Sequence, residues 1–507
     1  MVEPILQVRN LWFQPTNASV TRNAITEIEI VDSYAPDDSV TVVDSWDASK
    51  EANGSVMCYV IGTKLIISGN GSGKIYLSNM GMNTFGGYTS GDEYSFINVE
   101  TLTGLHLLDT SRATSGMSSF FAYMAKVKSL DVSGFTLTQT GYIGSMFLGC
   151  RALETVNLSG WDTSAITQFS NLFNGCASLQ TVDISNFDCT NATTFALMFG
   201  YTGLKKIVFP KEFSLCANVS SMFEESKNLS EIDVSNWDTS KCTKMAFMFY
   251  GCTSLKEIDV SKWDVSNVQN FDHFAAHANL KRSGIENWKT TSATNMNALF
   301  HNCAEEELDL SGWDVSKNQF FCQMFENSSN LKRIKGLEKW NTSAGLGFDG
   351  MFERCSKLEE LDLSSFNTTK AKNGTSASDN GHKTATLNNM FLSCNNLKKV
   401  TVGPNFAVNG NGSNTTAANK AILPTPSTDY IEGADGNWYT FIGDSFAPNA
   451  MKDKTAETYY ASPVMVYDAD VIVKNSSLID AAKAIREKNG TTTHYTPAQF
   501  GAAIRSL

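Results

Sequence analysis

Apolar and polar residues alternate in the same short pattern again and again along the chain. In LKEIDVSKW, Ile258 and Val260 flank Asp259, so a strand here would turn two aliphatic side chains inward and the carboxylate outward. The stretch around it, CTSLKEIDVSKWDVSN (252–267), closely resembles CASLQTVDISNFDCTN (176–191) and CRALETVNLSGWDTSA (150–165). The pattern therefore predicts one short strand in each repeated unit.

A second predicted element follows each strand. Asp-Thr-Ser or Asp-Val-Ser supplies short polar side chains that can cap the N-terminus of a helix. The apolar spacing in MAFMF (245–249) then predicts a short helix with Met248 and Phe249 toward the core. Each unit is thus expected to contain one strand and one short helix.

The spacing of the units indicates how they assemble. The Phe of the MF segment recurs, mostly at intervals near 26 residues, at Phe121, Phe147, Phe173, Phe199, Phe223, Phe249, Phe274, Phe300, Phe325, Phe352 and Phe391. A Ser/Asn/Gly/Thr-rich insertion at 368–386 lengthens the last interval, and a weak extra copy begins near residue 97. A period of 20 to 29 residues with Leu at fixed offsets is typical of leucine-rich repeats, whose units stack because none can bury its own apolar edge. The sequence therefore predicts an α/β solenoid of about eleven units.

Two further side-chain positions follow the same period. An aromatic residue four positions after the strand Asp predicts a spine of stacked rings, at Phe135, Trp161, Phe187, Trp237, Trp263, Trp288, Trp313 and Phe366, with Trp340 one residue later. Six of the eleven cysteines share a position that holds Ser226, His277 or Ser328 in other units, at Cys150, Cys176, Cys252, Cys303, Cys355 and Cys394. Because this position accepts Ser, we interpret these cysteines as reduced packing residues rather than disulfide partners.

Composition and charge exclude several classes of protein. The chain has 507 residues, 42% of them hydrophobic and 18% charged, which is typical of a folded protein. The formal net charge of −12, with no Lys/Arg stripe, argues against binding to nucleic acid or to an anionic membrane. No run of about 18 apolar residues predicts a membrane-spanning helix. The start MVEPILQVRNLWFQPTNASV does not resemble a Sec signal peptide, so we expect a chain that stays where it is made, leaves by a route such as cell lysis, or has been processed.

The outward strand position is the main candidate for ligand binding. It forms an acidic ladder, expected on the concave surface, at Asp131, Asn157, Asp183, Asp233, Asp259, Asp309 and Asp362. Such a row could bind sugar hydroxyls, a basic protein patch or Ca²⁺. Alternatively, each Asp caps its local turn or keeps the sheet soluble.

The chemistry-bearing residues do not form a catalytic pattern. His273 and His277 would share one helical face, and His301 is the candidate third metal ligand, but the HExxH glutamate is missing and inward packing is the preferred interpretation. GNGSGK (69–74) lacks the spacing of a P-loop. No GxSxG motif or Cys/His nucleophile context is present, so we predict a protein that is not an enzyme and needs no cofactor or metal.

The repeats resemble the BspA-type leucine-rich repeat family of bacterial, parasite and bacteriophage surface proteins. Met248–Ser266 and Met351–Thr368 match almost all of that family's unit, while departures occur at Val208, Gly284 and Lys335. The resemblance implies a β-rich N-terminal cap, with strands around SVMCYVIG and TKLIISG, and a C-terminal cap. The expected organisation is an anchoring or assembly segment (1–37), the N-terminal cap (38–96), the repeats (97–405), the C-terminal cap (406–470) and a helical hairpin (471–507).

The ends of the chain direct the functional hypothesis. The hairpin at 471–507 resembles modules of phage tail and baseplate proteins, so we expect a non-catalytic virion protein that binds a host-surface glycan or protein and contacts other virion proteins. If the ends dock into a symmetric particle, a homo-oligomer is expected there. The alternatives are a bacterial cell-surface adhesin of the same repeat family and a glycan-degrading enzyme, which would need a deep pocket with one distinct carboxylate pair.

Overall fold

The computed structural model describes most of the repeat region and parts of both ends. The described residues are 15–48, 56–70, 75, 77, 84–85, 96–112, 116–137, 141–211, 213–278, 280–371, 387–408, 420–440 and 444–462. The chain divides into two compact units, unit 1 (Met1–Ile258) and unit 2 (Asp259–Leu507).

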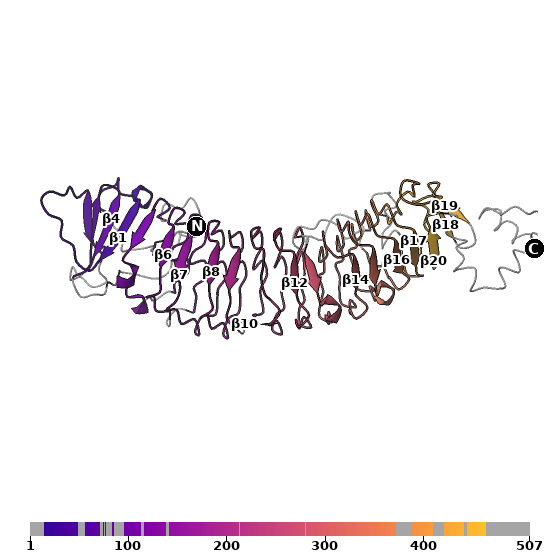
Figure 1. Ribbon diagram of the computed structural model, residues 1–507, viewed down its shortest axis with the longest axis horizontal. Helices are drawn as coiled ribbons and strands as arrows, with labels where there is room; N and C mark the ends of the chain where they lie inside the picture. The colour runs from indigo at the N-terminus through magenta and orange to yellow at the C-terminus, as the bar shows by residue number, and fades with distance from the viewer. Residues whose placement is uncertain are drawn as a thin grey trace, which may run out of the picture. The chain divides into compact units, whose positions relative to one another are not determined.

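Unit 1 begins with a mixed five-stranded sheet (Figure 1). Its strands are β1 (Glu27–Val31), β2 (Asp44–Asp47), β3 (Met57–Ile61), β4 (Lys64–Ser68) and β5 (Thr101–Thr103), in the order β2-β3-β4-β1-β5. Strand β1 runs parallel to both β4 and β5, and β2, β3 and β4 pair antiparallel. The two strands expected around SVMCYVIG and TKLIISG are present as β3 and β4. Lys64 crosses the sheet to Glu27 and Glu29 at 2.8 and 2.7 Å.

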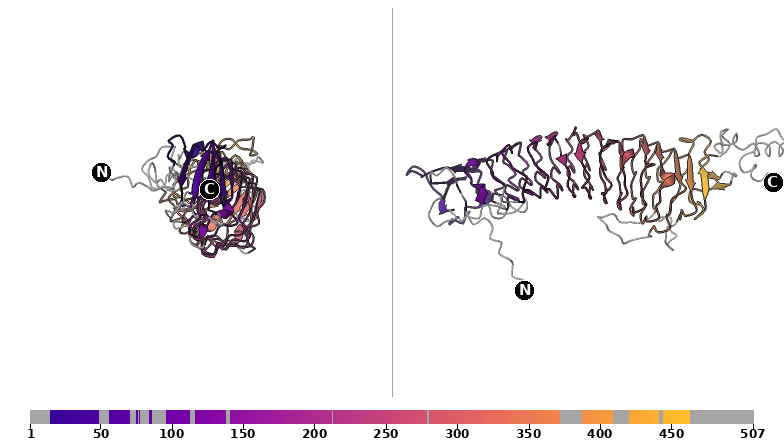
Figure 2. Two further views of the ribbon diagram at one scale, coloured as in Figure 1. Left: turned by 90° about the vertical axis from the view of Figure 1, so that its left-hand side faces the viewer. Right: turned by 90° about the horizontal axis from the view of Figure 1, so that it is seen from below.

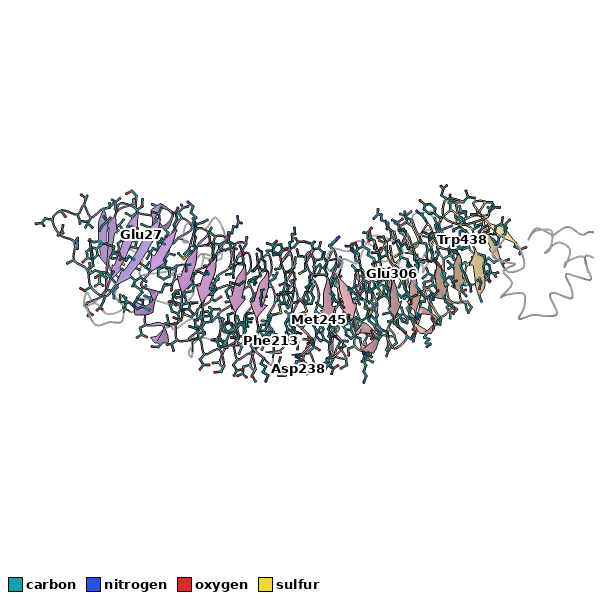
Figure 3. The ribbon with its side chains drawn as sticks, viewed as in Figure 1. Glu27, Phe213, Asp238, Met245, Glu306 and Trp438 are labelled. Carbon is teal, nitrogen blue, oxygen red and sulfur yellow. The ribbon has the colours of Figure 1, made fainter. Side chains whose placement is uncertain are left out.

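The repeats of unit 1 contribute very short strands of two or three residues. The elements are η1 (Arg22–Ala24), η2 (Leu105–Leu107), η3 (Thr110–Arg112), β6 (Ser129–Asp131), β7 (Thr155–Asn157), β8 (Thr181–Asp183), β9 (Lys206–Val208), β10 (Phe213–Ser214) and β11 (Trp237–Asp238). The strands pair in parallel as β6-β7, β8-β9 and β10-β11, with Phe213 of β10 in register with Trp237 of β11 and Ser214 with Asp238. Phe213 and Asp238 are labelled in Figure 3. Parallel pairing of consecutive strands follows because each repeat returns to the same edge before the next strand begins.

A second ladder joins the turns of unit 1. Single parallel bridges connect one residue per repeat, in the order Tyr142, Gln168, Thr194, Asn218 and Lys244. These residues are 24 to 26 positions apart, so the turns repeat with the same period as the strands. The backbone of each repeat is therefore hydrogen-bonded to the next at two separate places.

Unit 2 continues with the same elements, and the boundary between the units falls within β12 (Glu257–Asp259). Its elements are β13 (Lys281–Ser283), η4 (Ile285–Asn287), β14 (Glu307–Asp309), β15 (Arg333–Lys335) and η5 (Leu337–Lys339). Strands β14 and β15 pair in parallel, and the turns are bridged through Asn270, Asn295, Phe320 and Gly347.

Unit 2 ends in a second five-stranded sheet (Figure 2). Its strands are β16 (Glu360–Leu363), β17 (Lys399–Val402), β18 (Trp438–Thr440), β19 (Ser445–Phe446) and β20 (Glu457–Tyr460), in the order β16-β17-β20-β18-β19. Strands β16 and β17 are parallel, whereas β20 pairs antiparallel with β17 and with β18.

The core is built from rows of aromatic rings, one ring per repeat. In unit 1, Phe121, Phe147, Phe173, Phe199, Phe223 and Phe249 stack with successive centroids 5.3 to 5.8 Å apart. In unit 2, Phe300, Phe325, Phe352 and Phe391 do the same at 5.4 to 6.0 Å. The ring spine predicted from the Trp/Phe position is confirmed, for example between Trp263, Trp288 and Trp313. Each such ring buries about 150 to 250 Å².

The cysteines are free and buried, which confirms their interpretation as packing residues. At the shared repeat position, the thiol donates to the Phe carbonyl of the preceding repeat, as from Cys150 to Phe121 O at 3.1 Å and from Cys355 to Phe325 O at 3.0 Å. Where the position holds serine, its hydroxyl makes the same bond, as from Ser328 to Phe300 O at 2.7 Å. The position therefore selects a small donor, which explains why Cys and Ser exchange.

The predicted fold class, an α/β solenoid with a helical C-terminal module, is wrong. The described residues contain no α-helix, only three-residue 3₁₀ helices, and their short strands form small separate sheets. MAFMF is a turn, with Phe247 at φ 58° and Gly251 at φ 69°. Two left-handed residues four positions apart cannot belong to a right-handed helix. The hairpin expected at 471–507 lies outside the described residues.

No helix in the part of the chain that the structure describes has the length and apolar character needed to cross a bilayer.

Candidate functional site

The predicted acidic ladder has a structural function in the turns. In all seven members, Oδ1 accepts the backbone N–H of the serine two residues later, at 2.9 to 3.2 Å, from Ser133, Ser159, Ser185, Ser235, Ser261, Ser311 and Ser364. A side chain bonded in this way to its own turn stabilises the bend after each strand. These hydrogen bonds agree with the turn-capping interpretation, and ligand binding by the row stays a prediction.

The electrostatics of the ladder agree with that function. The pKa values of Asp131, Asp183, Asp259 and Asp309 are lowered, mainly because the hydroxyl and then the backbone N–H of the following serine bind the ionised carboxylate. Hydrogen bonds to the charged form stabilise it. These carboxylates therefore remain ionised well into the acidic range.

A different repeat position carries the more varied chemistry. Two residues after the Phe position, the backbone is left-handed in every repeat, and we call these residues the left-handed column. In unit 1 it consists of Tyr123, Gly149, Gly175, Tyr201, Glu225 and Gly251, and in unit 2 of His277, Asn302, Asn327, Arg354 and Ser393. The φ angles lie between 56° and 77°. Only glycine adopts this conformation without cost, and Asn tolerates it better than most other residues.

The backbone of the column is used in the same way in both units. In eight of the eleven column residues the N–H donates to a carbonyl of the next repeat, as from Tyr201 to Glu224 O at 2.7 Å in unit 1 and from Asn327 to Glu353 O at 2.9 Å in unit 2. The left-handed conformation is thus tied to the contact between repeats, while the side chain is left to vary.

In unit 2 the column lines a polar groove of about 560 Å³. The polar groove is formed by the five column residues of unit 2 and four neighbours, and its lining is His277, His301, Asn302, Asn327, Ser329, Arg354, Ser356, Ser393 and Asn395. Its size falls within the range of small-molecule sites, about 300 to 1,000 Å³. Amide, hydroxyl, imidazole and guanidinium groups make up its lining side chains.

His301 is the most unusual residue of the polar groove. It is 6% exposed, its ring centroid lies 4.3 Å from that of His277, and its Nε2 lies 3.1 Å from Asn327 Nδ2. Burial, reinforced by the neighbouring His277 and His273, lowers the pKa of His301 to about 4. The ring is therefore neutral at physiological pH. Its buried Nδ1 has no hydrogen-bond partner.

The charges beside the groove are balanced within the protein. Arg354 Nη1 lies 3.3 Å from Glu326 Oε1 and 3.2 Å from Glu353 Oε1. The two carboxylates are largely buried, and burial together with the charge of Glu353 raises the pKa of Glu326. One guanidinium thus faces two acidic side chains, so the groove has no excess positive charge.

The three histidines singled out from the sequence are only partly brought together. His277 and His301 adjoin in the groove, whereas His273 is buried with Nδ1 2.8 Å from Asp272 Oδ1. His273 and His277 have φ angles of 52° and 60°, so the proposed shared helical face is wrong. In this repeat Ala275, one residue after Phe274, occupies the place in the fold that a Phe fills in the other repeats. Among the residues that the structure describes, no group of three or more His, Cys, Asp and Glu is arranged to hold a metal ion.

Sequence reasoning missed the column and the groove. The available signal was the glycine that recurs two residues after Phe, at Gly149, Gly175 and Gly251, because a regularly placed glycine indicates a left-handed backbone. The groove itself combines residues from five repeats. No single repeat therefore contains a pattern that reveals the groove.

Comparison with known proteins gives one match. A family model described as "Mycoplasma protein of unknown function, DUF285" matches residues 114–208, 210–313 and 272–389, together more than half of the chain. No curated protein and no solved structure matches significantly.

Proposed function

Because the chain belongs to the DUF285 family, which is associated with BspA-like repeat proteins, we propose that it is a non-catalytic recognition protein that binds a glycan or protein on a host-cell surface. The proposal places the chain in a phage particle, where other virion proteins hold it.

One observation supports recognition above the others. At the left-handed column the backbone geometry is retained throughout and its hydrogen bond to the next repeat in eight of eleven residues, while the side chain ranges from Gly to Tyr, Glu, His, Asn, Arg and Ser. A binding surface needs this combination, because its contacts can change without altering the frame that holds them. A column that served stability alone would favour glycine throughout, since glycine has no steric cost in this conformation.

The chemistry of the polar groove supports binding rather than catalysis. Its nearest carboxylates, Glu326 and Glu353, both pair with Arg354. A glycoside hydrolase needs two carboxyl groups that face each other across the scissile bond, about 5 to 10 Å apart. Carboxylates committed to the same guanidinium are poorly suited to act as a general acid and a nucleophile.

The placement in a virion rests on the ends of the chain. The resemblance of 471–507 to tail and baseplate modules supports attachment through the C-terminal end, and residues 1–37 provide a second candidate for attachment. Attachment to a symmetric particle would make the chain a homo-oligomer in that particle.

Immunogold electron microscopy of the source culture, with antibodies against the full chain, tests this placement. Labelled tails or capsids are expected, and adhesion of purified particles to host cells should fall when the antibodies are added. Label confined to cell envelopes would contradict the virion placement.

A bacterial cell-surface adhesin is the second candidate. The family description names Mycoplasma, a cellular source, and this favours a protein displayed by a bacterium. Under this proposal the same antibodies label intact cells, and the particles remain unlabelled.

A further inference from the structure

We propose that the polar groove of unit 2 binds a neutral carbohydrate of one or two sugar rings, which makes it the recognition site for the glycan. This inference rests on the proposed function, since it names the site and the ligand class through which recognition would occur.

The lining of the groove matches the chemistry of sugar hydroxyls. A hydroxyl both donates and accepts hydrogen bonds, and the side-chain amides of Asn302 and Asn395 do the same. Asn327 offers its Oδ1 as an acceptor, since its Nδ2 already lies 3.1 Å from His301 Nε2 and 3.4 Å from Glu326 Oε1. Ser329, Ser356 and Ser393 add three hydroxyls of their own. A ligand with many hydroxyls can therefore replace the water that these groups bind, whereas an apolar ligand would leave them without partners.

The charge distribution favours a neutral ligand over an anionic one. Arg354 is the cationic side chain of the lining, and it already pairs with Glu326 and Glu353 at 3.3 and 3.2 Å. Burial of His301 keeps its ring neutral, so the imidazole adds no positive charge at pH 7. A phosphate, sulfate or acidic sugar would have to compete with two carboxylates for one guanidinium.

His301 supplies a group with unmet hydrogen-bonding capacity. If Nε2 accepts the Asn327 amide at 3.1 Å, the neutral ring carries its proton on Nδ1, which is buried without a partner. A buried donor without a partner costs about 1 to 3 kcal/mol. Because this atom is buried, a sugar oxygen would reach it as an acceptor only if the ring turned toward the groove.

The volume sets the size of the ligand. A groove of about 560 Å³ exceeds the needs of a metal ion or a single phosphate, and it accommodates one or two sugar rings with water. The groove therefore fits the end or a short segment of a glycan chain.

The test uses the full chain and variants that preserve the backbone. Asn302→Gly and Asn327→Gly remove the amides but retain the left-handed conformation, because the chain itself has glycine at this position at Gly149, Gly175 and Gly251. Tyr201→Gly makes the same kind of change in unit 1 and is the matched control. Ser356→Ala is a further groove variant with no change of backbone freedom.

Saturation-transfer NMR and calorimetry at pH 7 would measure binding of lactose, maltose and N,N′-diacetylchitobiose, with 3′-sialyllactose and digalacturonic acid as acidic counterparts. We expect at least one neutral disaccharide to bind. Asn327→Gly should weaken that binding tenfold or more, Asn302→Gly and Ser356→Ala should weaken it severalfold, and Tyr201→Gly should leave it unchanged.

Other outcomes separate the two proposals. Binding of the acidic sugars alone, or binding that the groove variants do not affect, would overturn the assignment. If no neutral disaccharide binds although the labelled chain adheres to host cells, the groove assignment fails and the recognition function stands. If the chain binds neither sugars nor host cells, both fail.

Discussion

The repeats of unit 1 and of unit 2 share a backbone but differ in what they display at the left-handed column. Three of the six column residues of unit 1 are glycine, and Tyr123 packs so closely over Gly149 that a Cβ there would lie 2.6 Å from its ring. The column of unit 2 consists mainly of His, Asn and Arg and opens into the polar groove. The repeat frame is therefore common to both units, whereas the site depends on a few side chains at the left-handed column.

The interiors of the units differ as well. In unit 1 the middle residue of a repeat strand is aliphatic, such as Val182, and a buried leucine such as Leu204 precedes the next strand. In unit 2 the middle residues of β14 and β15 are also aliphatic, but β13 carries Arg282 and the segment before β14 carries Glu305. These two side chains are joined at 3.1 Å and are 1% and 6% exposed. Unit 2 has thus replaced one apolar contact between repeats by a buried ion pair.

The ion pair gives the largest predicted effect. Glu305→Leu leaves the Arg282 guanidinium buried without its partner, so the free energy of unfolding should fall by about 3 to 5 kcal/mol. Burial acts to raise the pKa of Glu305, but the charge and hydrogen bonds of Arg282 outweigh it and hold the pKa below its usual value. The measurement is hydrogen exchange of backbone amides in β13 and β14, which reports unit 2 alone.

The double variant Arg282→Ile with Glu305→Leu restores the apolar pattern of unit 1 and is the control. It should unfold within about 1 kcal/mol of the parent, because apolar replacement of a buried pair is often neutral or stabilising. If the double variant is as unstable as the single one, an apolar pair does not fit this place in unit 2, and the interiors of the two units are not equivalent.

The pH dependence gives the next largest effect. Because the pKa of His301 is lowered from 6.5 to about 4, the folded state binds this proton less readily than the unfolded state. Its contribution is fully present above pH 6.5 and is lost as the pH falls toward 4. At about 1.4 kcal/mol for each pKa unit, unit 2 should lose up to about 3 kcal/mol over this interval.

The control for this prediction is His301→Asn, which should flatten the pH profile of hydrogen exchange in unit 2 between pH 6.5 and 4. The pKa values of the turn-capping carboxylates Asp259 and Asp309 are lowered by their serine hydrogen bonds, so these groups titrate below this interval. An unchanged slope in His301→Asn would contradict the assignment. Unit 1 should show no comparable slope in this interval at its left-handed column, which contains no histidine.

Much of the fold was predictable because the repeat imposes the same residues at the same burial. The inward pair Ile258 and Val260, the aromatic spine and the cysteine position all follow from the period. The helices were predicted wrongly because Met245, Met248 and Phe249 have helical spacing in a segment that is a turn. Apolar spacing alone cannot distinguish a helix from a turn whose left-handed residues direct the same side chains inward.

The site was less predictable than the fold. The Asp row was visible as a pattern because seven repeats carry an Asp or Asn at this position, and the serine hydrogen bonds show that this recurring feature serves the frame. The polar groove depends on departures such as His301 and Arg354, whose proximity follows only from the parallel stacking of the repeats. The one-residue shift at Ala275 further hid the alignment of His277 with Asn302.

Substitutions at the left-handed column test which side chains its backbone conformation tolerates. Asn302→Val places a β-branched residue at φ 56° and should destabilise unit 2 by about 1 to 2 kcal/mol, whereas Asn302→Gly should change stability by a few tenths. In unit 1, Gly175→Val at φ 77° should cost at least as much. Hydrogen exchange of the two turns checks the prediction, and a tolerated valine in either unit would show that the left-handed conformation is not required there.

The cysteine position gives the smallest expected effect and joins the two units by a common rule. Cys150 in unit 1 and Cys355 in unit 2 each donate to a Phe carbonyl, and serine does so elsewhere, so Cys→Ser should be nearly neutral and Cys→Ala should cost about 1 kcal/mol.

Burial raises the pKa of the Cys150 thiol to about 12, and the pKa of the Cys355 thiol also lies well above its usual value. Because the thiolate is the reactive form, a thiol reagent such as Ellman's should modify none of the eleven cysteines quickly in the folded chain and all of them in denaturant. Rapid native labelling confined to one unit would show that its repeats open more readily, and the shared frame would then differ in stability as well as in surface chemistry.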